Sequence, residues 1–131
     1  YLRGNFRSTW FSSGGYGPIA KTLFAHCPVD GFFLEYDTDR AGDFNPLHHI
    51  KDQKVVLGLV TSKSADLENP EAIKRRIKEA SALVPLDQLA LSPQCGFAST
   101  EEGNLLTEED EWKKLTPYPQ HWPREVWPDA D

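Results

Sequence analysis

Three short apolar runs dominate the hydrophobic pattern of this chain. They cover residues 29–34, 54–60 and 86–91, and each is predominantly apolar with few polar interruptions. Runs of this length without a regular polar alternation are typical of parallel strands that helices cover on both faces. We therefore predict three buried strands, of which residues 54–60 form the clearest.

The segments around these runs have the signals of helices. Pro18 suits the first position of a helix, and apolar residues follow it at helical spacing. Asn69 is a good cap for a longer helix, whose apolar face is formed by Ile73, Ile77, Ala80 and Val84. Thr107 and Asp110 resemble a capping box for a helix that follows the third strand.

Strands that alternate with helices predict an α/β fold with a parallel sheet and right-handed crossovers. Three strands and their helices do not close a barrel, which needs about 250 residues. The 131-residue chain is therefore expected to form part of a larger domain. We place its domain at residues 1–115. The Pro-rich tail at residues 116–131 is expected to be irregular, because proline cannot continue a helix.

Composition narrows the class of protein and its partners. The chain is 39% hydrophobic with a formal net charge of -6, which suits a small domain with a core and argues against a nucleic-acid partner. The basic residues at 74–78 lie within a predicted helix among acids, so we expect a solvated helix face. Two cysteines make no disulfide framework, and no apolar run is long enough to cross a membrane. A reducing, cytoplasmic location is expected.

A glutamate and a cysteine stand at the ends of two predicted strands. Glu35 directly follows residues 29–34, and Cys95 follows residues 86–91 after a Pro-containing turn. The carboxyl ends of parallel strands lie at one edge of a sheet, so both side chains are expected there. Because carboxylate and thiolate both ligate zinc, Glu35 and Cys95 are the candidate metal ligands. The alternatives are a salt-bridged or solvated Glu35 and a buried, inert Cys95.

Several segments together resemble the cobalamin-independent methionine synthases. The resemblance is closer to the shorter methionine-synthase-like proteins that carry only the C-terminal catalytic barrel. The matching segments are residues 3–5 (RGN), 12–16 (SSGGY), 29–44 (VDGFFLEYDTDRAGDF), 55–64 (VVLGLVTSKS) and 85–97 (PLDQLALSPQCGF). The resemblance extends from about Arg3 to Leu115 and implies a partial TIM (β/α)8 barrel, made of C-terminal βα units with a parallel sheet.

The resemblance also implies a zinc site. The family holds zinc with a His-x-Cys pair at one strand end, a glutamate at the next and a cysteine near the last. By position, Glu35 matches the glutamate and Cys95 matches the later cysteine. The His-x-Cys pair would directly precede Arg3, so its cysteine falls at Leu2 and its histidine before Tyr1. Leucine cannot ligate a metal, so both members of this pair are missing from the sequence.

For function, the resemblance implies a zinc-dependent methyltransferase of methionine biosynthesis. Zinc would hold the homocysteine sulfur as a thiolate, which attacks the methyl group of 5-methyltetrahydropteroyltriglutamate, a methyltetrahydrofolate, to give methionine. The expected partners are therefore homocysteine or another thiol and methyltetrahydrofolate, with self-association through open barrel edges. The alternatives are a catalytically inactive, truncated remnant and a metal-free relative of the uroporphyrinogen decarboxylase type, which Cys95 disfavours.

A few other residues have weaker signals. His26 beside Cys27 and the pair His48 and His49 could replace lost ligands, but adjacent helical residues point apart. We expect Cys27 to be an ordinary buried residue. Lys63 follows the clearest strand, where the resemblance implies histidine in the methionine synthases proper and lysine in the shorter relatives. A solvated loop lysine is the alternative.

Overall fold

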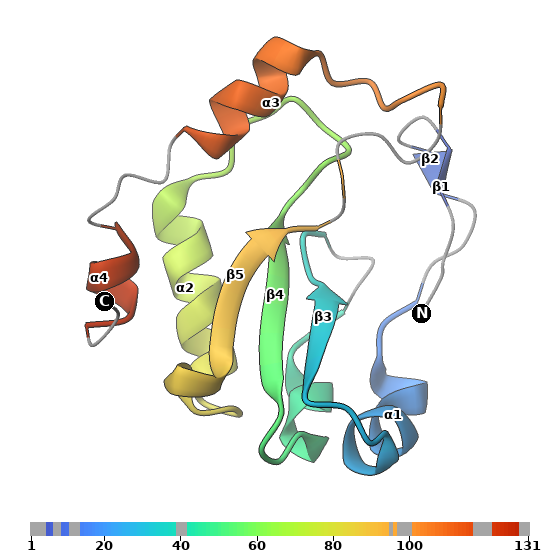
Figure 1. The fold of residues 1–131 in the computed structure, drawn as a ribbon, viewed down its shortest axis with the longest axis vertical. Coiled ribbons are helices and arrows are strands. Elements are labelled where there is room, and N and C mark those ends of the chain that lie inside the picture. The colour runs from blue at the N-terminus through green and yellow to red at the C-terminus, as the bar shows by residue number, and fades with distance from the viewer. Residues whose placement is uncertain are drawn as a thin grey trace.

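The computed structural model of the chain describes residues 5–6, 9–10, 14–38, 42–94, 96, 101–116 and 122–128. Its central sheet has three parallel strands in the order β3–β4–β5 (Figure 1). These strands are β3 (Gly31–Glu35), β4 (Lys54–Val60) and β5 (Leu89–Pro93). A separate antiparallel pair is formed by β1 (Asn5–Phe6) and β2 (Thr9–Trp10).

Short and long helices connect and flank these strands. They are η1 (Gly17–Ile19), α1 (Ala20–His26), η3 (Asn45–His49), α2 (Pro70–Ser81), η4 (Leu86–Gln88), α3 (Glu108–Leu115) and α4 (Trp122–Val126). No helix in the described ranges is both long and apolar enough to span a lipid bilayer.

The register of the sheet sets its residues in rows that cross all three strands. These rows are Phe32–Val55–Leu89, Phe33–Val56–Ala90, Leu34–Leu57–Leu91 and Glu35–Gly58–Ser92. Successive side chains of a strand point to opposite faces, so the first and third rows share one face and the second and fourth share the other. We name these the covered face and the open face.

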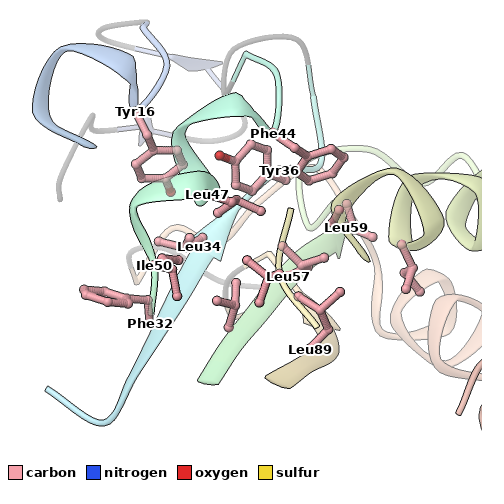
Figure 2. Close-up of a cluster of buried hydrophobic side chains, with 14 of the residues drawn as sticks. Tyr16, Phe32, Leu34, Tyr36, Phe44, Leu47, Ile50, Leu57, Leu59 and Leu89 are labelled. Carbon is pink, nitrogen blue, oxygen red and sulfur yellow. The ribbon is translucent and has the colours of Figure 1, made fainter. Parts of the chain in front are cut away.

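The covered face carries the core of the molecule. Leu57 at its centre is fully buried, and burial of a leucine side chain stabilises a fold by about 1.5–3 kcal/mol. Phe24 of α1, Leu47 of η3 and Ile77 of α2 belong to the same buried cluster. Figure 2 shows side chains from the strands and the preceding loops gathered on this side of the sheet. Three helices thus cover one face, as a βαβ fold requires.

The open face has no described helix over it (Figure 1). Phe33 is 81% exposed, Ala90 is exposed and Val56 is half-buried. In the described part of the chain, the predicted burial of the three strands therefore holds for the covered face and not for the open face. Both faces are apolar at mid-strand, although the described residues pack against only one of them.

The predicted start of α2 is confirmed. The side chain of Asn69 accepts a hydrogen bond from the Glu71 backbone N–H at 2.9 Å, and Pro70 occupies the first turn. The helix ends at Ser81, before the predicted limit, while Val84 beyond it is still buried. Of the basic side chains on this helix, Arg76 lies 4.4 Å from the centre of the Phe44 ring instead of being fully solvated.

Two other predicted boundaries differ from those in the structure by a few residues. Pro18 lies in the short helix η1, which leads directly into α1. The third strand begins at Leu89, three positions later than predicted, because the residues after Pro85 form η4 first. Pro85 itself has the extended conformation that separates helix from strand.

The capping box of α3 is present as predicted, with the Thr107 hydroxyl and the Asp110 carboxylate each bonded to the other residue's backbone N–H. The sequence did not predict that Lys114 on this helix is buried, whereas Trp112 is 62% exposed. The Lys114 ammonium donates to the Asp66 carbonyl at 2.6 Å and to a Glu68 carboxylate oxygen at 3.0 Å. These bonds join α3 to the loop that follows β4.

Part of the Pro-rich tail is ordered. Residues 122–126 form α4, where we predicted an irregular segment, so that prediction is wrong for these residues. The Trp127 indole N–H donates to the Leu86 carbonyl at 2.9 Å, and Val126 packs against the core. Pro123 lies in the first turn of α4, where proline is tolerated. Residues 117–121 and 129–131 lie outside the described residues.

Candidate functional site

The carboxyl ends of the three parallel strands lie at one edge of the sheet (Figure 1). We name this the carboxyl edge; its last complete row is Glu35–Gly58–Ser92. Glu35 is half-buried and belongs to the open face. Its backbone N–H donates to the Tyr16 hydroxyl at 2.8 Å, which ties the end of β3 to the segment before α1. The structure therefore places Glu35 where the sequence predicted it.

The second candidate ligand, Cys95, lies outside the described residues, but Gln94 before it lies within them. The Gln94 backbone N–H donates to the Val60 carbonyl at 2.8 Å, so the pairing of β5 with β4 continues to the carboxyl edge. Gln94 therefore lies at the same edge of the sheet as Glu35. The roles of Glu35 and Cys95 as metal ligands stay predictions.

Gly58 lies between these two strand ends. A Cβ atom placed on Gly58 would lie 2.9 Å from the Gln94 Cα and 3.1 Å from the Leu34 carbonyl oxygen. Such contacts are too close for real side chains, so glycine is needed for the backbones to approach one another here. Glu35 is the register partner of Gly58 on the other side. Because Gly58 has no side chain, the end of β3 and the residue after β5 can both approach β4 closely at this position.

A polar network joins the loop after β4 to Gln94. The Lys63 ammonium donates to the Gln94 side-chain oxygen and to the Ser62 hydroxyl, both at 2.9 Å. The Ser62 hydroxyl also donates to the Gln94 side-chain oxygen at 3.1 Å, and the Asn104 side-chain amide donates to the Ser62 carbonyl at 3.0 Å. Lys63 is half-buried, and its ammonium group is hydrogen-bonded to side chains at the carboxyl edge. The alternative of a solvated loop lysine is therefore wrong.

A second carboxylate at this edge was not singled out from the sequence. Burial raises the pKa of Asp37 above its ordinary value, and the nearby Glu35 charge adds to the rise. A hydrogen bond with Thr61 and the charge of Lys63 act in the opposite direction. Asp37 follows Glu35 by two residues, so the two-residue period of a strand was the signal that could have found it.

A pocket of about 250 Å³ opens beside Asp37, between the ends of β3 and β4 and the start of α2. Asp37, Thr38 and Arg76 are among its lining residues. Within the described ranges, Asp37 Oδ1 and Thr38 Oγ1 are buried and have no hydrogen-bond partner. The carboxyl edge therefore has polar atoms with unused hydrogen-bonding capacity.

The described residues do not by themselves fit a zinc ion. Among them, no group of three or more His, Cys, Asp or Glu side chains could hold a metal. Structural zinc takes four ligands and catalytic zinc takes three from the protein. Glu35 and Asp37 supply carboxylates at the edge but no nitrogen or sulfur. Any complete site would need Cys95 and further ligands from outside the described residues.

The substitute ligands considered from the sequence do not form such a group either. His26 is exposed at the end of α1, and the rings of His48 and His49 stack on each other with centres 3.9 Å apart. Cys27 is a free cysteine that is half-buried and packs against the core. Cys27 thus packs as an ordinary residue, as predicted, but it is less buried than predicted.

Curated relatives match this chain in sequence, whereas no family model matches it. The chain is 64% identical over 115 residues to the uncharacterized protein YxjH of Bacillus subtilis (strain 168). It is 63% identical over 115 residues to the uncharacterized protein YxjG of the same organism. Each match covers 86% of this chain but 30% of the relative. The chain thus spans less than a third of the length of these curated relatives.

Solved structures match the fold. One is the "Putative Vitamin-B12 Independent Methionine Synthase" from Listeria monocytogenes, with a TM-score of 0.64 and 48% identity, covering 90% of this chain and 33% of that one. Another is a B12-independent methionine synthase from Shewanella sp. W3-18-1 in complex with selenomethionine. Its TM-score is 0.63 at 21% identity, covering 76% of this chain and 27% of that one, and it supports the fold alone. The predicted α/β fold, a partial barrel of βα units with a parallel sheet, is confirmed.

Proposed function

We propose that this chain is part of a zinc-dependent methyltransferase of the cobalamin-independent methionine synthase type, which acts in methionine biosynthesis. The observation that carries the proposal is the match to the Listeria monocytogenes structure, at 48% identity over 90% of the chain. One fold can support many activities. The methyltransferase activity is favoured by the sequence identity to this structure and by the residues at the carboxyl edge.

The carboxyl edge supports the proposal chemically. Glu35 lies on the open face at this edge, and Gln94, the residue before Cys95 in the sequence, lies at the same edge. We propose these two side chains as two of the zinc ligands. Zinc, when bound, supplies a Lewis acid that stabilises the thiolate form of a thiol. The proposed substrates are homocysteine or another thiol and a methyltetrahydrofolate.

The surrounding residues have positioning roles in this proposal. Lys63 and Ser62 hold the side chain of Gln94, and therefore orient the chain that leads into Cys95. Burial raises the pKa of Asp37, and one of its carboxylate oxygens is buried, so it holds a proton at the edge more readily than an exposed carboxylate does. No catalytic step is assigned to the metal, because the described residues do not complete its ligand set.

Zinc binding tests the proposal directly. The experiment compares the chain with a variant that restores the implied pair, with Leu2→Cys and a histidine added before Tyr1. We expect the restored variant to bind one zinc ion per chain, measured by elemental analysis and by competition with a chelator. Cys95→Ser or Glu35→Gln in this background should weaken binding at least about tenfold, because each removes a direct ligand.

Cys27→Ser is the matched control, because Cys27 is a cysteine that packs against the core away from the edge. It should leave the zinc content unchanged. A restored variant without zinc, or one whose zinc survives Cys95→Ser, would contradict the proposed site.

One observation favours a second candidate function, a catalytically inactive remnant. Leu2 stands where the family resemblance implies a cysteine ligand. The two functions differ in an assay of methyl transfer from methyltetrahydrofolate to homocysteine. The assay uses YxjH in which this chain replaces the matched 115 residues, with and without Leu2→Cys. Activity that requires Leu2→Cys favours a remnant of an active ancestor, whereas activity in both favours the enzyme.

A further inference from the structure

The pocket between α2 and the ends of β3 and β4 combines both signs of charge with apolar lining. Asp37 and Arg76 supply the charges, while Leu59 and Ile73 are among its apolar residues. We propose that this pocket binds an α-amino acid with an apolar side chain, whose ammonium group lies at Asp37 and whose carboxylate lies at Arg76. Such a site goes beyond the proposed methyl transfer, because it needs neither zinc nor a folate.

Two lining residues carry buried oxygens that call for a hydrogen-bond donor. Asp37 Oδ1 and Thr38 Oγ1 are buried, and neither has a hydrogen-bond partner among the described residues. Folded proteins leave few buried polar atoms unpaired, because an unmade hydrogen bond is costly. An ammonium group has three N–H donors and no acceptor. A ligand ammonium would therefore supply what the Asp37 carboxylate and the adjacent Thr38 hydroxyl lack.

The guanidinium group of Arg76 is held beside the same segment. It donates a long hydrogen bond of 3.4 Å to the Tyr36 carbonyl, directly before Asp37, and lies 4.4 Å from the centre of the Phe44 ring. These contacts fix the position of the group but use only part of its five N–H donors. A planar guanidinium matches a carboxylate through two parallel hydrogen bonds. Arg76 is therefore suited to the carboxylate of the ligand.

The apolar part of the pocket comes from α2 and the covered face of the sheet. One face of α2 lines the pocket, with residues at helical spacing: Asn69, Ala72, Ile73 and Arg76. Tyr36 and Leu59 belong to the buried cluster on the covered face (Figure 2) and also line the pocket. An apolar side chain of the ligand would therefore contact Leu59 and Ile73.

The combination of charges disfavours simpler ligands. A lone anion such as phosphate would meet the carboxylates of Asp37 and Glu68, which both line the pocket, and a lone cation would meet Arg76. An uncharged apolar molecule would leave the buried Asp37 Oδ1 unpaired. The volume of about 250 Å³ suits a small molecule. An α-amino acid carries both charges and an apolar group on one small carbon frame.

The pocket is distinct from the proposed zinc site. Glu35 belongs to the open face of the sheet, whereas Tyr36 and Leu59 of the pocket belong to the buried cluster on the covered face. The lining residues come from β4, from α2 and from the loops beside them, and Glu35 is not among them. An amino acid bound here would therefore leave the proposed zinc ligands free.

An NMR titration of the 131-residue chain with L-methionine tests the proposal. We expect saturable chemical-shift changes at Thr38 and Ile73, with a dissociation constant of about 1 mM or tighter. Asp37→Asn and Arg76→Gln should each weaken binding at least about tenfold, because each removes one charged partner of the ligand. Arg76→Gln also removes the contact with the Phe44 ring, so Arg76→Lys is the second variant. It keeps the charge and should retain part of the binding.

Asp52→Asn and Arg75→Gln are the matched controls, since both residues are exposed and neither lines the pocket. They should leave the dissociation constant within about twofold. The melting temperature of each variant shows that it is folded before binding is compared.

Two analogues of methionine separate the two charges. N-acetyl-L-methionine lacks the ammonium group and L-methionine amide lacks the carboxylate, so each should bind at least about tenfold more weakly than L-methionine. Asp37→Asn should not weaken the first further, and Arg76→Gln should not weaken the second further. Absence of methionine binding, binding that survives both substitutions, or an equal loss in the controls would overturn the proposal. The titration contains no zinc and no folate, so its outcome does not depend on methyl transfer.

Discussion

The covered and open faces of the central sheet are built from alternate residues of the same three strands, but among the described residues only the covered face is packed against helices. On the covered face, Leu57 is fully buried beneath helices, whereas Phe33 on the open face is 81% exposed. Both faces are apolar at mid-strand. An apolar run therefore indicates that a strand is suited to burial, but it does not indicate which of its faces the described chain covers.

The largest expected effect tests whether a side chain on the covered face contributes more to the free energy of unfolding than one on the open face. Leu57→Ala should lower the free energy of unfolding by about 3 kcal/mol, because it leaves a cavity in a packed core. Phe33→Ala removes a larger side chain but should change the free energy of unfolding by less than about 0.5 kcal/mol. Chemical denaturation of the 131-residue chain measures both. Equal losses would show that the open face is packed in solution.

The second prediction concerns the ion pair that joins α3 to the loop after β4. Lys114→Met should lower the free energy of unfolding by about 2 kcal/mol, because it leaves the Glu68 carboxylate half-buried without its ammonium partner. The control is Lys113→Met, whose exposed pair with Glu109 contributes little. Urea denaturation followed by Trp fluorescence compares the two variants. A loss at Lys113 as large as that at Lys114 would contradict the assigned role.

The third prediction tests the close approach at the carboxyl edge. Gly58→Ala should cost about 1.5 kcal/mol, since its Cβ would lie 2.9 Å from the Gln94 Cα and one strand end must move. Gly17→Ala is the control, because a Cβ at Gly17 meets no atom within 4 Å. NMR chemical shifts should change at Gln94 in the first variant alone. A Gly58→Ala variant with unchanged Gln94 shifts would contradict the proposed convergence.

The smallest effect is a pH dependence at Asp37. Because burial raises the pKa of Asp37 above 3.8, the folded chain holds this proton more tightly than the unfolded chain does. The contribution of Asp37 to stability therefore falls as the pH rises from 3.8 through the folded pKa. Asp37→Asn should stabilise the chain at pH 7, by on the order of 1 kcal/mol or less, and the gain should disappear at a pH below 3.8.

Denaturation at both pH values checks this, with the exposed Asp52→Asn as control. A loss of stability in Asp37→Asn at pH 7 would show that the carboxylate is favourably engaged instead.

The covered face was predictable from the sequence because its signals are local. Asn69 caps α2, and Thr107 and Asp110 form the capping box of α3. The apolar run at 54–60 forms β4 with the same bounds. On the open face, the position of Glu35 at a strand end was predictable because it directly follows an apolar run. These features need only the order of residues within one element and its immediate neighbours.

The parts that the sequence did not predict depend on distant contacts. Lys114 is buried because Asp66 and Glu68, which are more than forty positions earlier, accept its hydrogen bonds. Residues 122–126 become helical where Trp127 contacts Leu86. The exposure of Phe33 could not be inferred either, because an apolar pattern does not state which face the chain itself covers.

Thiol cross-linking tests the central claim, that the chain carrying Cys95 and the Glu35 position meet at one edge. In a Cys27→Ser background, Glu35→Cys should cross-link to Cys95 with a bifunctional reagent that reaches less than about 10 Å, detected by intact and peptide mass spectrometry. Asp30→Cys lies at the amino end of β3, about 16 Å away along the strand. It should not cross-link. A cross-link from position 30 and none from position 35 would contradict the account.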